Sequence, residues 1–408
     1  MHIVYIHQYF GTPNHIGGVR SYEFARRWLA KGHKITMLTT TCNLSECDLS
    51  NATGKFFKKC VIEGIDVIAM KIAYKQQMGT FSRLFSFFSF LLLSSFFVLF
   101  VKKVDVVYAT STPLTVGVPA LVCKWLRKKP YVFEVRDQWP EPFIERGVIR
   151  SKIVIVMLLW LERTIYKYSS AIVALSPGMA KGIREVLGDL QKPIEVVPNC
   201  SDVELFGPDV DGSDIRKKYN WSDKLVFLHA GAMGRANGLD FVIKVASRLK
   251  TTQDVHFVLL GKGKEKQFLR KTAEELGLKN VEFLDFVPRI KLPSFFAACD
   301  VSMVIFENYR ILEDNSANKF FDSLSSGKPV LLNYSGWQRE VLEKNKAGFG
   351  CRRWDMDEFV EKVLYFNSHR ERLLEMGRNA RKLAIEKYPR DKLALKALET
   401  VTSNVDVN

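Results

Sequence analysis

The apolar positions of the chain form short runs that alternate with longer amphipathic segments. In the first forty residues, an apolar run at 3–6 precedes a loop, and a second run lies at 34–38. The segment between them has the period of a helix and ends at Gly32. Further runs of strand length lie at 61–68, 104–109, 131–135 and 171–175. This alternation is typical of a parallel sheet covered by helices on both faces.

The same pattern starts again in the second half of the chain. Strand-like runs at 225–229, 255–260, 281–284, 301–304 and 329–332 alternate with helical segments. The dividing point lies near Pro198, and a last helical segment follows Pro389. The sequence therefore predicts an α/β protein with two successive domains, 1–197 and 198–388. We expect a C-terminal helix within 389–408 to cross back onto the first domain.

One apolar run is too long for a strand. Residues 84–101 are 18 uncharged positions rich in Phe and Leu, bounded by Arg83 and Lys102. As a helix this run is about 27 Å long, which is marginal for a membrane span. A true crossing would place strands of one sheet on opposite sides of the bilayer, so we exclude it. Two interpretations remain: a helix buried against the sheet, or a helix embedded in one leaflet.

The charge of the chain bears on this choice. The net charge is +16, which suits nucleic acid, an anionic membrane surface or a phosphate-bearing substrate. No helix-turn-helix pattern or interleaved basic and aromatic patch is present, so we exclude nucleic acid. A second apolar run at 153–161 is followed by basic and aromatic residues, which is typical of a membrane interface. We therefore favour association with the inner face of the plasma membrane.

The cysteines indicate the compartment. There are seven, without the spacing of a disulfide framework, as expected for reduced thiols in the cytoplasm. Cys42 and Cys47 lie near each other, but no second ligand pair accompanies them, so we expect no metal site. The first residues read as a strand rather than a secretory signal. These observations predict a cytoplasmic protein, peripheral or monotopic on the membrane.

Four motifs carry candidate chemistry. The first is the pair Gly17 and Gly18, which follows the first predicted strand and opens a helix. Glycines let the backbone approach a ligand closely, and the free N–H groups of a helix start favour phosphate. An ordinary turn between a strand and a helix would have the same sequence.

The second motif runs from Glu134 to Glu141 and includes Arg136, Asp137 and Trp139. It begins inside a predicted buried strand and carries its charges past the strand's carboxyl end, where open α/β sheets bind ligands. Three carboxylates and an arginine would be costly in a core unless they were paired. A structural network of ion pairs is the alternative.

The third motif is the turn from Gly231 to Gly238, after the first strand of the second domain. Arg235 within it could bind a diphosphate. The spacing differs from the GxGxxG fingerprint of a dinucleotide fold, which argues against a dehydrogenase.

The fourth motif, 314–330, is the most informative. Asn315 and Ser316 can cap a short helix that leads through Gly-Lys-Pro into a strand. Lys319 and Asp322 lie three residues apart, so both could face one cleft. A lysine suits a phosphate and a carboxylate suits sugar hydroxyls. A solvated helix face would have the same composition.

Taken in order, these motifs resemble the family-four glycosyltransferases of GT-B fold. Further elements of the resemblance are Gly32-His33, Ser176-Pro177, Val197-Pro198-Asn199, Gly261-Lys262-Gly263 and Asp285 to Pro288. The resemblance covers nearly the whole chain. The run from Arg136 to Glu141 is similar to a bacterial branch that builds surface polysaccharides, including L-N-acetylfucosamine transferases.

The resemblance implies two Rossmann-like domains that face each other across a cleft, the first for the acceptor and the second for the nucleotide sugar. It implies a retaining transfer, with no metal or cofactor, from a UDP-linked sugar such as N-acetyl-L-fucosamine. The acceptor would be a saccharide on polyprenyl diphosphate, in O-antigen or capsule synthesis. An epimerase-like enzyme or a sugar-nucleotide binder of the same fold is the alternative.

The resemblance also assigns roles to residues. It places the donor diphosphate near Gly17, Gly18, Arg235 and Lys319, the ribose on Asp322, and further donor contacts on Asp314 and Asn315. It places Asp137 beside the transferred sugar as the candidate catalytic residue, with Arg136, Trp139 and Glu141 toward the acceptor. Two departures stand out: Ala232 and Asn237 replace an arginine and a lysine of relatives, and Asp314 and Asp322 replace a pair of glutamates.

Overall fold

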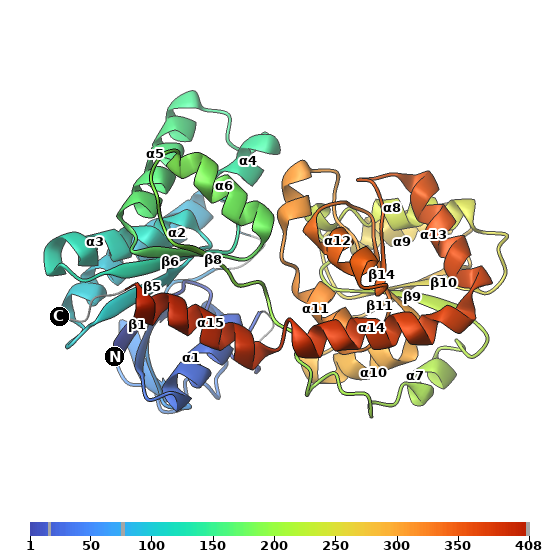
Figure 1. Ribbon diagram of the computed structural model, residues 1–408, viewed down its shortest axis with the longest axis horizontal. Coiled ribbons are helices and arrows are strands. Elements are labelled where there is room, and N and C mark those ends of the chain that lie inside the picture. Colours follow the sequence, from blue (N-terminus) through green and yellow to red (C-terminus); the bar gives the residue numbers. More distant parts are fainter. Residues whose placement is uncertain (15–17, 75–77, 405–408) are drawn as a thin grey trace. The chain divides into compact units, whose positions relative to one another are not determined.

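The chain folds into two compact units in the computed structural model, which describes residues 1–14, 18–74 and 78–404. The first unit comprises Met1–Pro198 and Arg390–Asn408, and the second comprises Asn199–Pro389 (Figure 1). Each unit has its own sheet with helices on both faces. The predicted α/β class with parallel sheets is confirmed.

The sheet of the first unit has the strand order β3-β4-β2-β1-β5-β6-β7-β8, and every neighbouring pair is parallel except β3 and β4. The bounds are β1 His2–Ile6, β2 Lys34–Thr40, β3 Phe57–Ile62, β4 Ile65–Met70, β5 Val106–Thr110, β6 Tyr131–Val135, β7 Ala171–Ala174 and β8 Ile194–Val196. The single strand predicted over 61–68 is therefore wrong. Glu63 and Gly64 both have positive φ and form the tight turn of an antiparallel hairpin instead.

Seven helices cover this sheet: α1 Arg20–Ala30, α2 Thr80–Phe100, α3 Gly117–Arg127, α4 Glu141–Glu145, α5 Lys152–Tyr168, α6 Pro177–Leu187 and α15 Arg390–Ser403, together with the short turns η1 Thr41–Asn43 and η2 Leu114–Val116, counted over the described residues.

The alternation of side chains along β1 separates the two helical layers. Tyr5 stacks on Trp28 of α1, with ring centroids 5.6 Å apart. The neighbouring Val4 and Ile6 point to the other face, into a core shared with Phe90 of α2. α15 packs beside α1, and the Trp28 indole N–H donates to the carbonyl of Ala394 at 2.8 Å. On the other face, α2, α3, α5 and α6 pack side by side in that order.

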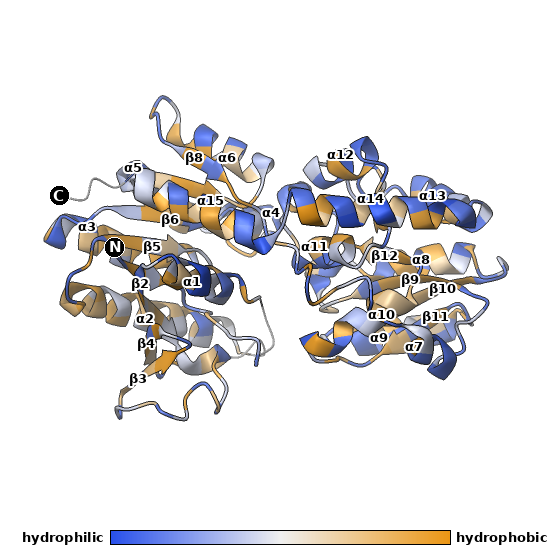
Figure 2. Cartoon of the chain, turned by 60° about the horizontal axis from the view of Figure 1, so that its bottom comes forward, coloured by the Kyte–Doolittle hydropathy of each residue, from blue (hydrophilic) through white to orange (hydrophobic). Residues whose placement is uncertain are grey.

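Helix α2 contains the long apolar run. Its segment Phe81–Phe100 is long and apolar enough to cross a membrane (Figure 2). Only 22% of the most apolar 18-residue window in it is buried. One row with a four-residue spacing, Ser86, Phe90, Ser94 and Val98, is buried in the first unit. Helix α2 is thus buried against the sheet along this row, as the first interpretation expects, whereas most of its remaining surface is not buried. The strands before and after it, β4 and β5, lie in one sheet, as the exclusion of a crossing requires.

Much of the remaining surface of α2 is apolar and exposed. The large apolar side chains exposed on α2 are Phe81, Leu84, Phe85, Phe88, Leu92, Leu93, Phe96 and Phe100. Helix α5 exposes a second set, which comprises Ile153, Val154, Val156, Met157, Leu159, Trp160 and Tyr168. Trp125 at the end of α3, which packs between these two helices, is also exposed. The exposed apolar side chains on this side are therefore numerous and lie on neighbouring helices, unlike the single exposed apolar residues that are common on protein surfaces.

The sheet of the second unit is entirely parallel, in the order β11-β10-β9-β12-β13-β14. Its strands are β9 Leu225–Ala230, β10 Val255–Leu260, β11 Val281–Leu284, β12 Val301–Val304, β13 Val330–Leu332 and β14 Gly348–Gly350. Its helices are α7 Ser213–Lys218, α8 Asp240–Arg248, α9 Lys266–Glu275, α10 Leu292–Ala298, α11 Asn318–Ser325, α12 Trp337–Lys344, α13 Met356–Ser368 and α14 Leu373–Glu386. The 3-10 turns are η3 Arg235–Asn237, η4 Arg289–Lys291, η5 Arg310–Asp314 and η6 Arg370–Arg372.

A buried ion pair ties together the parts of the first unit. Arg20, the first residue of α1, donates from Nε at 3.0 Å and from Nη2 at 2.9 Å to Glu134 of β6. Its other N–H groups donate to the carbonyls of Val197 and Pro198, where the chain leaves the unit. Glu134 also accepts from the hydroxyls of Tyr108 and Thr110. Burial alone would raise the pKa of Glu134, but Arg20 and Arg136 hold that pKa below its ordinary value.

We expect Arg20→Met to destabilise the first unit by about 3–5 kcal/mol, because it leaves a buried carboxylate without its partner. The matched control is Arg26→Met on the same helix, whose pair with Glu63 is exposed and whose loss costs under about 1 kcal/mol. Chemical denaturation followed by circular dichroism measures both.

The pH dependence separates the ion pair from simple loss of packing. In the wild type, the stability that Glu134 contributes is present at neutral pH and is lost as the pH falls through its lowered pKa. Without Arg20, burial favours the protonated, neutral form of Glu134. The difference in free energy of unfolding between wild type and Arg20→Met should therefore become smaller from pH 7 to pH 5. A difference that stays constant over this range would contradict a charged pair.

Candidate functional site

The carboxyl ends of β1, β5 and β6 bring polar side chains to one edge of the first sheet. Asp137, just after β6, is exposed and accepts from the hydroxyl of Thr112, after β5, at 2.6 Å. The backbone N–H of Arg136 donates to the hydroxyl of Ser111 at 2.9 Å. This is the edge at which open α/β sheets bind ligands.

Behind this edge, Arg136 is held by a buried histidine. Its guanidinium Nη1 lies 3.2 Å from Nε2 of His7, and Nδ1 of His7 lies 2.9 Å from the hydroxyl of Ser21. Burial, and then the charge of Arg136, lower the pKa of His7 well below its ordinary value, so the ring is neutral. Since a guanidinium only donates, Nε2 must accept, and Nδ1–H donates to Ser21. His7 is therefore a fixed support for Arg136.

His7 lies outside the four motifs that the sequence indicates. The available signal was its place directly after a fully buried strand, at the carboxyl end, where a polar residue is unexpected in a core. Gln8, the next residue, is also buried, and within the described part of the chain its side-chain amide has no hydrogen-bond partner.

The remaining residues of the second motif have separate environments. Glu134 belongs to the buried ion pair with Arg20, so it does not join Asp137 and Glu141 at this edge, and the expected cluster of three carboxylates is wrong. For Glu134 the alternative of a structural network of ion pairs is correct. Trp139 is half-buried, packs on Phe143 with ring centroids 4.1 Å apart and touches the core. Glu141 is exposed as the first residue of α4.

The glycine pair is only partly within the described residues. Gly17 lies outside them. Gly18 is exposed and stands two residues before α1, whose N-cap residue Val19 forms no side-chain cap.

In the second unit, the turn after β9 is packed against the end of β10. A Cβ atom on Gly261 would lie 1.9 Å from the carbonyl oxygen of Gly231, and a Cβ on Gly263 would lie 2.1 Å from that of Met233. Only glycine permits this approach, since real Cβ atoms do not come so near. The close packing places the η3 turn, with Arg235 and Asn237, at the carboxyl edge of this sheet.

Lys319 reaches this turn from α11. Its ammonium donates to Oδ1 of Asn237 at 2.7 Å, lies 3.5 Å from Nε2 of the buried His229, and stands 5.1 Å from the ring centroid of Phe306. It forms no ion pair with a carboxylate among the described residues. Burial lowers the pKa of Lys319 to about 7. A cation with neutral neighbours at a strand's carboxyl end is suited to an anionic ligand.

Asp322 has a different set of partners. Its two carboxylate oxygens accept from Nη1 and Nη2 of Arg289 at 3.0 and 2.9 Å, and its side chain is buried. Lys319 thus contacts the η3 turn, whereas Asp322 contacts the guanidinium of Arg289. This difference contradicts the expectation that both side chains face one cleft. Residues three apart point about 60° apart around a helix, which is enough to give them separate neighbours. A ribose contact at Asp322 would have to compete with Arg289.

The capping prediction is also corrected. The N-cap of α11 is Ala317, which forms no side-chain cap. Asn315 accepts from the N–H of Ala317 at 2.9 Å and so shapes the turn before the helix, while Ser316 accepts from the N–H of Asn199 at 2.9 Å. Asp314 ends the η5 turn and is half-buried.

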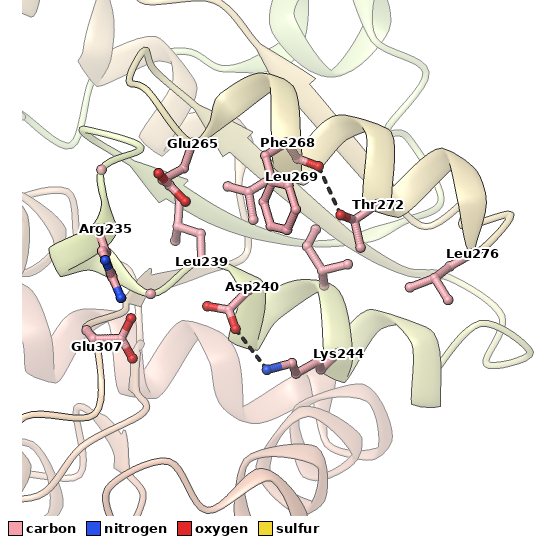
Figure 3. A pocket seen from close by; sticks show the side chains of 13 residues that line it. Arg235, Leu239, Asp240, Lys244, Glu265, Phe268, Leu269, Thr272, Leu276 and Glu307 are labelled. Carbon is pink, nitrogen blue, oxygen red and sulfur yellow. Dashed lines mark hydrogen bonds and ion pairs between the residues drawn. The ribbon is translucent and has the colours of Figure 1, made fainter.

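Arg235 is exposed beside a groove of about 370 Å³ between α8 and α9. Figure 3 shows Arg235 and Glu307 at one end of this groove, with Phe268 and Leu269 along its wall. Arg235 is part of the η3 turn and Lys319 contacts that turn through Asn237. The two cations form no hydrogen bond with each other. Within the described residues, no group of three or more His, Cys, Asp or Glu side chains could hold a metal ion.

Comparison with known families now adds to this geometry. Residues 17–200 match the family described as "Glycosyl transferase 4-like domain", and residues 211–383 match "Glycosyl transferases group 1". The two matches follow the division into units closely. The chain belongs to the glycosyltransferases.

Individual relatives are distant. The chain is 21% identical over 253 residues to a probable glycosyltransferase, WbjE, of Pseudomonas aeruginosa, covering 61% of this chain and 63% of the relative. It is 24% identical over 208 residues to a GDP-mannose-dependent alpha-(1-6)-phosphatidylinositol monomannoside mannosyltransferase of Mycobacterium tuberculosis, covering 50% and 54%. Less than two thirds of each of these relatives is therefore matched.

Solved structures show the same fold over the full length. The structure of Alr3699/HepE of Anabaena in complex with UDP has a TM-score of 0.71 at 17% identity, covering 99% of this chain and 100% of that one. The GT-B architecture is thereby confirmed for the glycosyltransferase. Its donor and acceptor residues remain predictions.

If Lys319 binds the diphosphate of the donor, its lowered pKa should make nucleotide binding depend on pH. Above pH 7 the free site must take up a proton before the ammonium can meet a diphosphate, so we expect the Kd for UDP to rise about tenfold per pH unit from pH 7 to 9. Lys319→Arg, whose side chain stays charged, should flatten this dependence. Titration calorimetry in two buffers of different ionisation enthalpy measures affinity and proton uptake together. Equal slopes for both proteins would exclude Lys319 as the titrating group.

Proposed function

We propose that this glycosyltransferase moves a sugar, with retention of configuration, from a UDP-sugar to a saccharide carried on polyprenyl diphosphate. The reaction would take place at the cytoplasmic face of the plasma membrane, in the synthesis of O-antigen or capsule. The observation that carries the proposal is Lys319, whose ammonium lies among neutral groups beside the η3 turn. A leaving diphosphate would supply the negative charge that this position lacks.

The donor is the better supported partner. A structure of the same fold contains UDP, whereas a relative is named for GDP-mannose. We choose uridine as the base, and N-acetyl-L-fucosamine as the sugar, because the run from Arg136 to Glu141 resembles that branch of polysaccharide transferases.

The chemistry sets the demands on the second unit. Breaking the bond between the anomeric carbon and the diphosphate oxygen develops positive charge on the sugar and negative charge on the leaving group. Cations and N–H dipoles fixed before the reaction stabilise that negative charge most strongly. Lys319 would do so from α11 and Arg235 from the exposed side of the turn. Asn237, which holds the Lys319 ammonium, would orient it, and the reaction would need no metal.

The first unit would hold the acceptor. Asp137 is exposed at the carboxyl edge of the sheet, and Thr112 fixes one of its oxygens. A carboxylate in that place can accept from a sugar hydroxyl. Arg136, supported by His7, and Glu141 would add further polar contacts, and Trp139 an apolar wall.

The apolar surface explains why the acceptor would be lipid-linked. Helices α2 and α5 expose rows of Phe, Leu, Ile and Val that a membrane interface would cover. The mannosyltransferase relative is named for a phosphatidylinositol-linked acceptor. The rival function, an epimerase-like enzyme or a sugar-nucleotide binder, gives these rows no role.

A donor screen tests the proposal. Purified protein is mixed with each nucleotide sugar and a polyprenyl-diphosphate saccharide, and release of nucleoside diphosphate is followed with and without EDTA. We expect release that requires both one donor and the lipid acceptor and that persists in EDTA. Release without any acceptor, or conversion of the donor into an isomer, would support the rival function.

Replacing the central cation tests its role in that reaction. We expect Lys319→Ala to lower kcat/KM by a factor of about 10²–10³, which corresponds to the loss of one preorganised group on developing charge. Lys271→Ala is the matched control, because Lys271 is exposed on α9 and pairs with the exposed Glu275 four residues on. Turnover near normal in a folded Lys319→Ala protein would sink the proposed role.

A further inference from the structure

A groove of about 610 Å³ runs along one side of α2. Four of its lining residues lie on α2 at a spacing of four, which places them in one row along the helix: Phe81, Phe85, Ser89 and Leu93. Further lining residues are Met78 and the segment 71–73, which directly follows β4. The groove is separate from the residues assigned to donor and acceptor.

The shape of the groove suits a linear apolar ligand. Leu93 lies twelve positions after Phe81, so the row is about 18 Å long. Ser82 and Ser89 are small and lie among bulky apolar side chains, which leaves a hollow between the phenylalanines and the leucine. A compact polar ligand such as a nucleotide would find few partners along such a wall.

The position of the groove relates it to the acceptor edge. β4, β2, β1, β5 and β6 are successive parallel neighbours, so their carboxyl ends lie on one edge of the sheet. Lys71 follows β4 on the same edge at which Asp137 follows β6. Four strand spacings separate the two strands, a lateral distance of about 19 Å. One extended molecule could therefore contact both.

The mouth of the groove carries a positive charge. Lys71 lines the groove, is exposed, and forms no ion pair in the part of the chain that the structure describes. A cation at the end of an apolar groove is complementary to an anionic head group joined to a single apolar chain. A phospholipid, with two chains, fits one narrow row less well than a single-chain lipid does.

We propose that this groove binds the first isoprene units of the polyprenyl chain of the acceptor, with Lys71 on the diphosphate. The inference rests on the lipid-linked acceptor of the proposed function and assigns that lipid a specific place. It separates two apolar surfaces of α2. The row that lines the groove would bind the lipid of the substrate. The outer row of Phe88, Leu92, Phe96 and Phe100 would contact the surrounding membrane lipids.

Farnesyl diphosphate, a soluble isoprenoid diphosphate, is the probe. Its binding is measured by equilibrium dialysis without detergent, and inorganic pyrophosphate alone is dialysed in parallel to report sites that bind only the head group. We expect Phe85→Ser and Lys71→Ala each to weaken binding at least about tenfold. Phe100→Ser is the matched control, because it removes an equally apolar and exposed residue from the far end of the same helix. All three side chains are exposed, so the fold should survive, and thermal melts verify this.

The outcomes distinguish the groove from the proposed function. Equal binding in wild type and Phe85→Ser, or equal losses in Phe85→Ser and Phe100→Ser, would overturn the groove assignment. Kinetics with the same saccharide on polyprenyl diphosphate and on a short soluble linker provide a second readout. Phe85→Ser should raise KM only for the polyprenyl substrate. An enzyme that uses only the soluble substrate would overturn the lipid-linked acceptor, whereas one that uses the lipid with unchanged KM in Phe85→Ser would overturn only the groove.

Discussion

The first unit is organised around the buried pair of Arg20 and Glu134. Arg20 starts α1, directly after the glycine loop, and Glu134 lies two residues before Arg136 on β6. Because the same guanidinium also binds the carbonyls of Val197 and Pro198, one side chain fixes the helix start, the strand end and the point where the chain leaves the unit. Each part of the candidate acceptor edge is thus within a few residues of a single charge-assisted contact.

The pair is also why this edge can hold so many polar groups. A buried carboxylate needs full compensation, and Glu134 receives it from a guanidinium and two hydroxyls. Asp137, three residues further on, is exposed and accepts from the hydroxyl of Thr112 instead. In the second unit the opposite arrangement holds, since the half-buried Lys319 has only neutral partners among the described residues. One unit has compensated its buried charge internally, while the other retains a charge that a ligand can compensate.

The sequence predicts strands best where both faces are buried. The runs at 131–135, 255–260 and 301–304 coincide with β6, β10 and β12, which are buried at every position, because mostly apolar runs leave little choice of register. It misses β8 and β14, which have three residues each and lie at sheet edges, one of them between two glycines. The hairpin at Glu63 and Gly64 was missed because two strands joined by a tight turn read as one run.

The sequence motifs identified candidate site residues but did not show which side chains these residues contact. Spacing along α11 showed that Lys319 and Asp322 are neighbours on a helix, but their actual partners, Asn237 and Arg289, lie 82 and 33 residues away in the sequence. Such contacts arise only when the sheet brings strand ends together. His7 illustrates the same limit, because its role depends on Arg136, 129 residues later.

The place of α15 has a consequence for how the protein is made. The chain leaves the first unit at Pro198 and returns at Arg390, and the start and end of the second unit are paired through Ser201 and Pro389. At ribosomal speed, the intervening residues take about 10–40 s to synthesise. During that time Trp28 lacks the carbonyl of Ala394 and the flank of α1 lacks its cover. The first unit therefore stays incomplete until α15 has been synthesised. A chain that lacks α15 would expose the uncovered side of α1, near the N-terminus, to chaperones and proteases.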